Sequence, residues 1–114
     1  LGLNLIKGNI KKLYYKNISF HKVPNTGFRE VFFSPKNKLI DEDIKKGYLY
    51  FNHSYGLLSK KFIYQHDILS HNDQLVASFN HENIFGMQFH PEKSQQFGLF
   101  LLKKFIDLSL STYR

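Results

Sequence analysis

The run Gly86-Met87-Gln88-Phe89-His90-Pro91-Glu92-Lys93-Ser94 decides the fold of this chain, because an apolar, strand-like segment ends there directly before a long helical pattern. The helical pattern extends from Ser94 to Leu108, and Ser94 is a candidate N-cap. Its apolar stripe consists of Phe97, Leu101, Phe105 and Leu108. A stripe of this width is typical of a helix that lies on a sheet. The run therefore predicts a sheet followed by a C-terminal helix.

Upstream segments have the alternation and the turn signals of strands. The expected strands are residues 8–13, 28–33, 48–55, 62–66, 75–79 and 84–89, with a hairpin loop at 80–83. Residues 41–47 place acidic residues first, basic residues next and a glycine last, which predicts a short helix. The pattern as a whole indicates an α/β fold in one domain.

The formal net charge of +7 raises the question of nucleic-acid binding. Only Arg29 and Arg114 are arginine, and the lysines are distributed along the chain. The lysine pairs are Lys11-Lys12, Lys45-Lys46, Lys60-Lys61 and Lys103-Lys104. Scattered pairs are typical of solvated surfaces, so we expect no nucleic-acid partner.

The 114-residue chain contains no cysteine, which excludes disulfides and cysteine-ligated zinc. Its longest apolar run is far short of the roughly 20 residues that a membrane span requires. We therefore expect a cytoplasmic protein without a membrane partner. The chain opens with Leu1-Gly2-Leu3 rather than methionine, and this opening has the features of neither a signal nor a transit peptide. We interpret the chain as truncated.

His90 and Glu92 have the spacing of two members of a catalytic triad. Pro91 favours extended geometry at His90, so the two side chains project to the same side of the backbone. A carboxylate that accepts the Nδ1–H of an imidazole leaves Nε2 free to exchange a proton with a nucleophile. Alternatively, Glu92 only favours the dipole of the following helix and His90 is a polar strand end. The spacing alone leaves both interpretations open.

Residues 83–95 closely resemble the C-terminal signature of class I, triad-type glutamine amidotransferases, most specifically that of the glutaminase subunit of imidazole glycerol phosphate synthase. Residues 1–8, 23–31 and 48–55 are similar to further segments of that family at lower specificity. The resemblance implies a flavodoxin-like sheet with late β-hairpins and a C-terminal helix. Residues 1–114 would be the C-terminal portion of one domain, whose N-terminal half carries the nucleophilic cysteine and the oxyanion hole.

The resemblance also implies a function. His90 and Glu92 would complete a triad with that cysteine and hydrolyse L-glutamine without a cofactor. The ammonia would pass to a cyclase subunit in a heterodimer that serves histidine biosynthesis. Because the chain lacks the nucleophile, we expect it to be inactive alone.

Further site residues follow from the same resemblance. His53, Ser54 and Tyr55 match the segment that helps to hold the glutamine, although a capped strand end with a core tyrosine is the alternative. Lys93 and Phe28 match positions near the synthase interface, where an ordinary surface lysine is the alternative.

The chain departs from the family where it reads Asn25-Thr26-Gly27-Phe28-Arg29, since histidine-synthesis members typically read His-Met/Ile-Gly-Trp-Asn. Two alternative functions therefore remain open. The chain could belong to an amidotransferase that supplies ammonia to a surface-polysaccharide sugar-modifying enzyme, or it could be a non-catalytic remnant of the fold. A metal site built with His66, His71 and His81 is a further alternative, but their spacing forms no recognised ligand motif, and we expect no metal.

Overall fold

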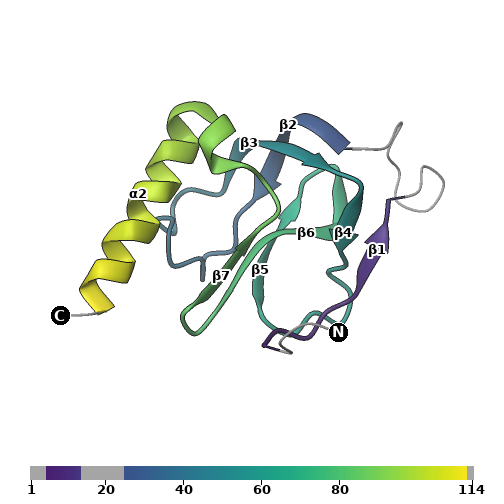
Figure 1. Cartoon of the computed structure of the whole chain (residues 1–114), viewed down its shortest axis with the longest axis horizontal. Coiled ribbons are helices and arrows are strands. Elements are labelled where there is room, and N and C mark those ends of the chain that lie inside the picture. The colour runs from purple at the N-terminus through teal and green to yellow at the C-terminus, as the bar shows by residue number, and fades with distance from the viewer. Residues whose placement is uncertain (1–4, 14–24, 113–114) are drawn as a thin grey trace.

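The computed structural model describes residues 5–13 and 25–112. These residues form strands, one short 3-10 helix and one long α-helix (Figure 1). In chain order the elements are β1 (Ile10–Lys12), β2 (Asn25–Phe32), β3 (Lys46–His53), β4 (Tyr55–Leu57), β5 (Gln65–Leu69), β6 (Asn72–His81), β7 (Ile84–Met87), η1 (Pro91–Lys93) and α2 (Gln95–Thr112). The predicted succession of a sheet and a C-terminal helix is confirmed.

The described strands form two antiparallel sheets. The larger one has five strands in the order β3-β2-β5-β6-β7, and the smaller one pairs β1 with β4. Strands β2 and β3 pair along their whole length, with Asn25 opposite His53. Register shifts between β5 and β6 around residues 67–69 bend the larger sheet, which curls in Figure 1. Ser54 alone separates β3 from β4, so the chain passes between the sheets through a one-residue bend.

Helix α2 packs at one side of the larger sheet, next to β3 (Figure 1). Leu101 is only 1% exposed, and Phe97 and Phe105 pack against the same core from partly buried positions. Gly47 of β3 provides space for Phe97, because a Cβ there would lie 2.5 Å from a ring carbon of that side chain. These contacts confirm the apolar stripe that predicted the helix.

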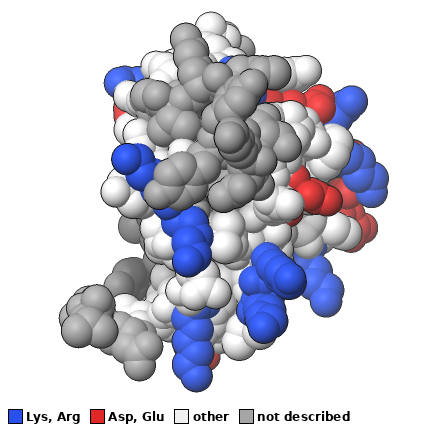
Figure 2. Space-filling view, turned by 90° about the vertical axis from the view of Figure 1, so that its right-hand side faces the viewer, with Lys and Arg blue, Asp and Glu red and all other residues white. Residues whose placement is uncertain are grey.

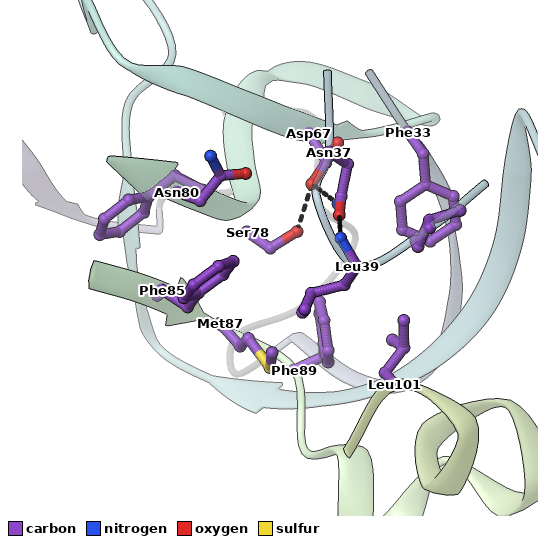
Figure 3. Close-up of a pocket in the computed structure, with 13 residues that line it drawn as sticks. Phe33, Asn37, Leu39, Asp67, Ser78, Asn80, Phe85, Met87, Phe89 and Leu101 are labelled. Atoms are coloured by element: carbon purple, nitrogen blue, oxygen red, sulfur yellow. Dashed lines mark hydrogen bonds between the residues drawn. The ribbon is translucent and has the colours of Figure 1, made fainter. Parts of the chain in front are cut away.

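Asp67 of β5 is a buried carboxylate that holds the segment after β2 against the sheet (Figure 3). It accepts hydrogen bonds from the Ser34 amide at 2.7 Å, the Asn37 side chain at 2.8 Å and the Ser78 hydroxyl at 2.6 Å. Burial raises the pKa of Asp67, and these hydrogen bonds oppose the rise. The adjoining cavity has a volume of about 10 Å³, which is room for one water molecule at most. This polar cluster is therefore structural and has no space for a substrate.

The prediction of a short helix at residues 41–47 is wrong. A single turn forms there, in which the Ile44 amide donates to the Asp41 carbonyl at 2.9 Å. The turn stops because Lys46 and Gly47 already pair with β2 as the first residues of β3. Charge order predicted a helix at this position, but tertiary pairing of the backbone decides the outcome.

The predicted strands are present, with shifted limits. The strand expected at 62–66 lies at Gln65–Leu69, and the one expected at 48–55 is interrupted at Ser54. The hairpin loop expected at 80–83 narrows to a two-residue turn, in which Glu82 has a φ of 54°.

Candidate active site

The segment between β7 and α2 lies against β3, where Ser94 contacts Tyr50 across 44 residues of sequence. The His90 amide donates to the Tyr50 carbonyl of β3 at 2.8 Å. Pro91 then begins η1, so the backbone turns away from the sheet directly after His90. The His90 side chain is thereby presented at the junction of sheet and helix.

Ser94 ties the same segment to β3 a second time. The Tyr50 amide donates to Ser94 Oγ at 2.8 Å, and the Ser94 hydroxyl donates to the His90 carbonyl at 2.7 Å. Ser94 directly precedes α2, and the Gly98 amide of that helix donates to its backbone carbonyl at 3.2 Å. Its hydroxyl bridges β3 and His90 and does not cap an amide of the helix, and Ser94 is only 2% exposed. The backbone of His90 is therefore held by hydrogen bonds at both its amide and its carbonyl.

His90 and Glu92 contact each other, with Nδ1 of His90 at 3.1 Å from Oε2 of Glu92. Their side chains are 40% and 57% exposed. The pKa of Glu92 is lowered, first by a hydrogen bond from its own backbone amide and further by His90. A carboxylate can only accept, so His90 donates through Nδ1, and in the neutral imidazole Nε2 carries the lone pair. This arrangement suits general base and then general acid catalysis.

Tyr50 brings the two expected interface residues next to the candidate triad pair. Its ring lies edge-on to Phe28 and His90, with centroid separations of 5.5 and 6.3 Å. The Lys93 ammonium lies 5.7 Å from the centre of the same ring, a cation–π distance. Phe28 is 43% exposed. Phe28 and Lys93 therefore flank one tyrosine beside His90.

An open groove of about 550 Å³ continues from this surface. Its lining residues are Phe28, Tyr48, Ser94, Gln95, Gln96 and Phe97. Tyr48 is 60% exposed, so the groove combines aromatic and amide side chains that are accessible from outside. We call this groove, together with Tyr50 and Lys93, the aromatic surface.

His53, Ser54 and Tyr55 lie at the bend between the two sheets. Nδ1 of His53 is 2.7 Å from the Tyr55 carbonyl oxygen, and Nε2 is 3.0 Å from the Asn25 side-chain nitrogen. Burial lowers the pKa of His53, the hydrogen bond with Tyr55 opposes this, and the charge of His90 lowers it further. The bend is thus within electrostatic reach of His90. Tyr55 is 56% exposed, whereas both ring nitrogens of His53 are engaged within the chain.

A model of the family described as "Glutamine amidotransferase class-I" matches residues 6–108. The chain belongs to the class I glutamine amidotransferases. This confirms the family predicted from residues 83–95 and, with the α/β fold, the predicted fold class.

Three relatives of this amidotransferase chain are HisH subunits of imidazole glycerol phosphate synthase. The imidazole glycerol phosphate synthase subunit HisH of Pyrococcus furiosus is 40% identical over 110 residues, which cover 91% of this chain and 52% of that protein. Subunit HisH 2 of Methanococcus maripaludis is 38% identical over 107 residues, covering 92% and 51%. The HisH subunit of Pelagibacter ubique is 34% identical over 107 residues, covering 94% and 51%. The chain spans about half the length of these relatives.

The three histidines of the metal alternative lie apart from the candidate triad pair. His66 Nδ1 bonds to the Tyr64 carbonyl at 2.8 Å, and the His81 ring lies 4.4 Å from the Tyr64 ring. The pKa of His71 is lowered by burial and next by Arg29. Within residues 5–13 and 25–112, no three histidine, aspartate or glutamate side chains form a cluster that suits a metal ion.

Figure 2 shows how charged side chains are distributed on one face of the molecule. On this face, lysine and arginine side chains occur at several places between neutral residues, and most of the acidic side chains lie at the upper right. This distribution matches the scattered lysine pairs of the sequence. In the part of the chain that the structure describes, no helix has the length and apolar character needed to cross a membrane.

Sequence reasoning missed Tyr50, Asn25 and Arg29 as residues of the site. Tyr50 stood within an aromatic strand, and nothing local indicated that its backbone holds His90 and Ser94. Asn25 and Arg29 fall in the stretch that departs from the family pattern. This departure was the signal in the sequence that could have pointed to them. That departure indicated a different partner but not a contact with His53.

Proposed function

We propose that this chain provides His90 and Glu92 of a Cys-His-Glu triad in the glutaminase subunit of imidazole glycerol phosphate synthase. The observation that carries this is the 3.1 Å contact between His90 and Glu92 at the sheet-to-helix junction of a class I amidotransferase. The similarity to HisH subunits supports the choice among amidotransferases.

In the proposed mechanism, Nε2 of His90 takes the proton of a cysteine thiol, and the thiolate attacks the side-chain amide carbon of glutamine. The tetrahedral intermediate collapses when His90 returns the proton to the leaving nitrogen, which releases ammonia and leaves a thioester. His90 then deprotonates a water molecule that attacks the thioester. Glutamate leaves and the thiol is restored. Glu92 holds the imidazole orientation and stabilises the imidazolium in both halves.

The chain has no cysteine, so the nucleophile would come from polypeptide outside residues 1–114. An open groove of about 240 Å³ exposes Ile10, Leu57, Met87 and neighbouring residues on the sheet. Ile10 is 63% exposed, which favours a covering layer. We infer that the nucleophile-bearing half of the amidotransferase domain packs there, and that residues 1–114 alone hydrolyse no glutamine.

Glutamine would lie between His90 and the bend at Ser54 and Tyr55. The backbone and hydroxyl groups at this bend suit the polar head of an amino acid. His53 supports the bend from inside, since its ring nitrogens bond to Tyr55 and Asn25. We therefore assign substrate contact to Ser54 and Tyr55 and a supporting role to His53.

The aromatic surface would receive the cyclase subunit. Exposed aromatic residues such as Phe28 and Tyr48 are enriched at interfaces, and Lys93 offers a cation to an acidic residue of the partner. The surface lies next to His90, so ammonia released there has a short path to a docked partner. The 25–29 departure favours a second candidate acceptor, a surface-polysaccharide sugar-modifying enzyme.

The experiment is glutamate release from glutamine by the protein expressed from its full gene, with and without the cyclase. We expect the cyclase to raise the rate, His90→Gln to lower kcat by about 10³-fold and Glu92→Gln by about 10²-fold. His81→Gln is the matched control, since His81 lies away from the triad pair, and should retain wild-type kinetics. Wild-type rates in His90→Gln would refute the proposed role of His90.

Stimulation of glutamine hydrolysis by an added synthase distinguishes the two candidate ammonia acceptors. A rate that rises with the cyclase supports histidine biosynthesis, whereas hydrolysis that responds only to a sugar-modifying synthase supports the second candidate. No hydrolysis under any condition would indicate a non-catalytic member of the family.

A further inference from the structure

A chain of hydrogen bonds runs from Arg29 through Asn25 to His53, next to the candidate active site. Arg29 donates through Nε to Asn25 Oδ1 at 2.9 Å, and Asn25 Nδ2 is 3.0 Å from His53 Nε2. Nδ1 of His53 lies 2.7 Å from the Tyr55 carbonyl. The chain connects β2, β3 and the start of β4. Asn25 in its centre is 1% exposed.

The hydrogen bonds at the two ends of this series, from Arg29 and to the Tyr55 carbonyl, specify the same protonation state of His53. Arg29 can only donate, so it faces the amide oxygen of Asn25 and turns the amide nitrogen toward His53. That nitrogen can only donate, so Nε2 of His53 carries a lone pair. The Tyr55 carbonyl can only accept, so Nδ1 of His53 carries the proton. His53 is therefore neutral, with its hydrogen on Nδ1.

The Arg29 side chain reaches Asn25 by folding back along β2 over Gly27. Four residues of regular strand span about 13 Å, so the Arg29 side chain has to extend back along β2 to reach Asn25. Gly27 lies between these two residues on the same face of β2, with a φ of 123°, and because it has no side chain the Arg29 side chain folds back over it toward Asn25. The guanidinium also donates to the carbonyls of Thr26 at 2.9 Å and Phe28 at 3.0 Å. A Cβ on Gly27 would lie 2.9 Å from Nη1 of Arg29.

The charge state of His53 matters for His90. In the proposed mechanism His90 becomes an imidazolium, and a second cation within electrostatic reach would disfavour that form. The burial of His53 and the influence of His90 act in the same direction, since both lower its pKa. Within residues 5–13 and 25–112, charged groups near this bend include Arg29, Glu92 beside His90, and Lys12, which lies opposite Tyr55 in β1.

We propose that Arg29 and Asn25 are positioning residues of the glutaminase: they hold His53 neutral, which fixes the Tyr55 carbonyl at the substrate bend and keeps a second positive charge away from His90. This assignment rests on the glutaminase function proposed above. His53 then acts through the bend and through its lack of charge, without touching the reacting atoms.

The first test is ¹⁵N NMR of the histidine rings in the protein expressed from its full gene. Near neutral pH, His53 should show a protonated Nδ1 and an unprotonated Nε2. In Asn25→Asp, a carboxylate faces Nε2 and can only accept, so His53 should become an imidazolium. A protonated Nε2 in the wild type would overturn the hydrogen-bond assignment.

The second test is kinetic. Arg29→Gln should raise KM for glutamine about fivefold and change kcat less than about twofold, because one hydrogen bond that orients the bend is lost. Arg29→Lys keeps the charge but not the planar fork and should resemble Arg29→Gln. Asn25→Asp should lower kcat about tenfold near neutral pH. It should also move the acidic limb of the pH profile to higher pH, because activity then returns only where His53 loses its proton.

The matched control is Thr26→Val. Thr26 Oγ1 bonds to Asn52 Oδ1 at 3.2 Å, so this variant removes the neighbouring cross-strand contact of the same two strands. It should leave KM, kcat and the pH profile unchanged. If Thr26→Val and Asn25→Asp show equal kinetics, the positioning role is refuted.

The two proposals can fail separately. Absence of glutamine hydrolysis in the wild type would refute the glutaminase function, and the NMR result would still decide the protonation state of His53. Full hydrolysis with an unaltered KM in Arg29→Gln would refute only the positioning role.

Discussion

Replacement of Ser94 by alanine should destabilise the protein and misplace His90. The substitution removes the acceptor of the Tyr50 amide at 2.8 Å and one donor to the His90 carbonyl at 2.7 Å. The His90 carbonyl keeps the Lys93 amide at 3.0 Å, so the Tyr50 amide suffers the larger loss. An unpaired, partly buried donor costs about 1–3 kcal/mol and the second bond about 0.5–1 kcal/mol. We expect the free energy of unfolding to fall by about 2–3 kcal/mol.

The assay is urea unfolding of the protein expressed from its full gene, monitored by circular dichroism. A loss of 2 kcal/mol should lower the midpoint by about 1 M, given urea slopes of about 1–3 kcal/mol per molar. Ser109→Ala is the matched control, because Ser109 donates only to the Phe105 carbonyl of its own helix at 2.9 Å. It should change the unfolding free energy by less than about 0.5 kcal/mol. If both variants unfold at the same midpoint, the bridge contributes no stability and the reasoning fails.

Three further outcomes follow from the fold and the site. Gly47→Ala should lower the unfolding free energy by about 1–3 kcal/mol, because the added methyl group meets Phe97 at 2.5 Å, and Gly47→Ala with Phe97→Leu should recover part of it in urea titrations. Gly27→Ala should lower the unfolding free energy by about 1–3 kcal/mol, because φ at this position is 123°; an unchanged urea midpoint would show that alanine fits there without strain. His53 and His71 have folded-state pKa values below the ordinary 6.5, so their contribution to stability is present above about pH 6.5 and is lost as the pH falls through the lowered values. Midpoints measured across this window should fall with pH in the wild type and fall less in His53→Gln with His71→Gln; equal slopes would exclude these two groups as the cause.

The junction around His90 was predictable because local rules agree there. An apolar strand, a proline and a helical stripe follow one another, and each specifies its own conformation. The same kind of local rule failed at residues 41–47, where a helix was predicted and none forms. One helical turn gains too little to form against pairing of its last residues, since Gly47 pairs with Val31 in the sheet.

The supporting contacts depend on geometry that the sequence does not display. Tyr50 holds His90 through backbone groups, which any residue offers, so its identity carries no signal. The contact between Arg29 and Asn25 passes over Gly27, where a Cβ would lie 2.9 Å from Nη1 of Arg29, and a glycine in a strand has several possible meanings. The site pair can therefore be predicted from residue types, whereas the residues that position it follow only from the fold.

Strand β3 lies at one end of the five-stranded sheet, and the segment from His90 to Ser94 occupies its outer edge at Tyr50. An uncovered edge strand offers its amides and carbonyls to any other chain, which favours edge-to-edge association. The residues that bring the imidazole to its place also close this edge at Tyr50. Selection against aggregation and selection for catalysis would thus act on the same short segment, and a chain that lost the chemistry would still have reason to keep Ser94.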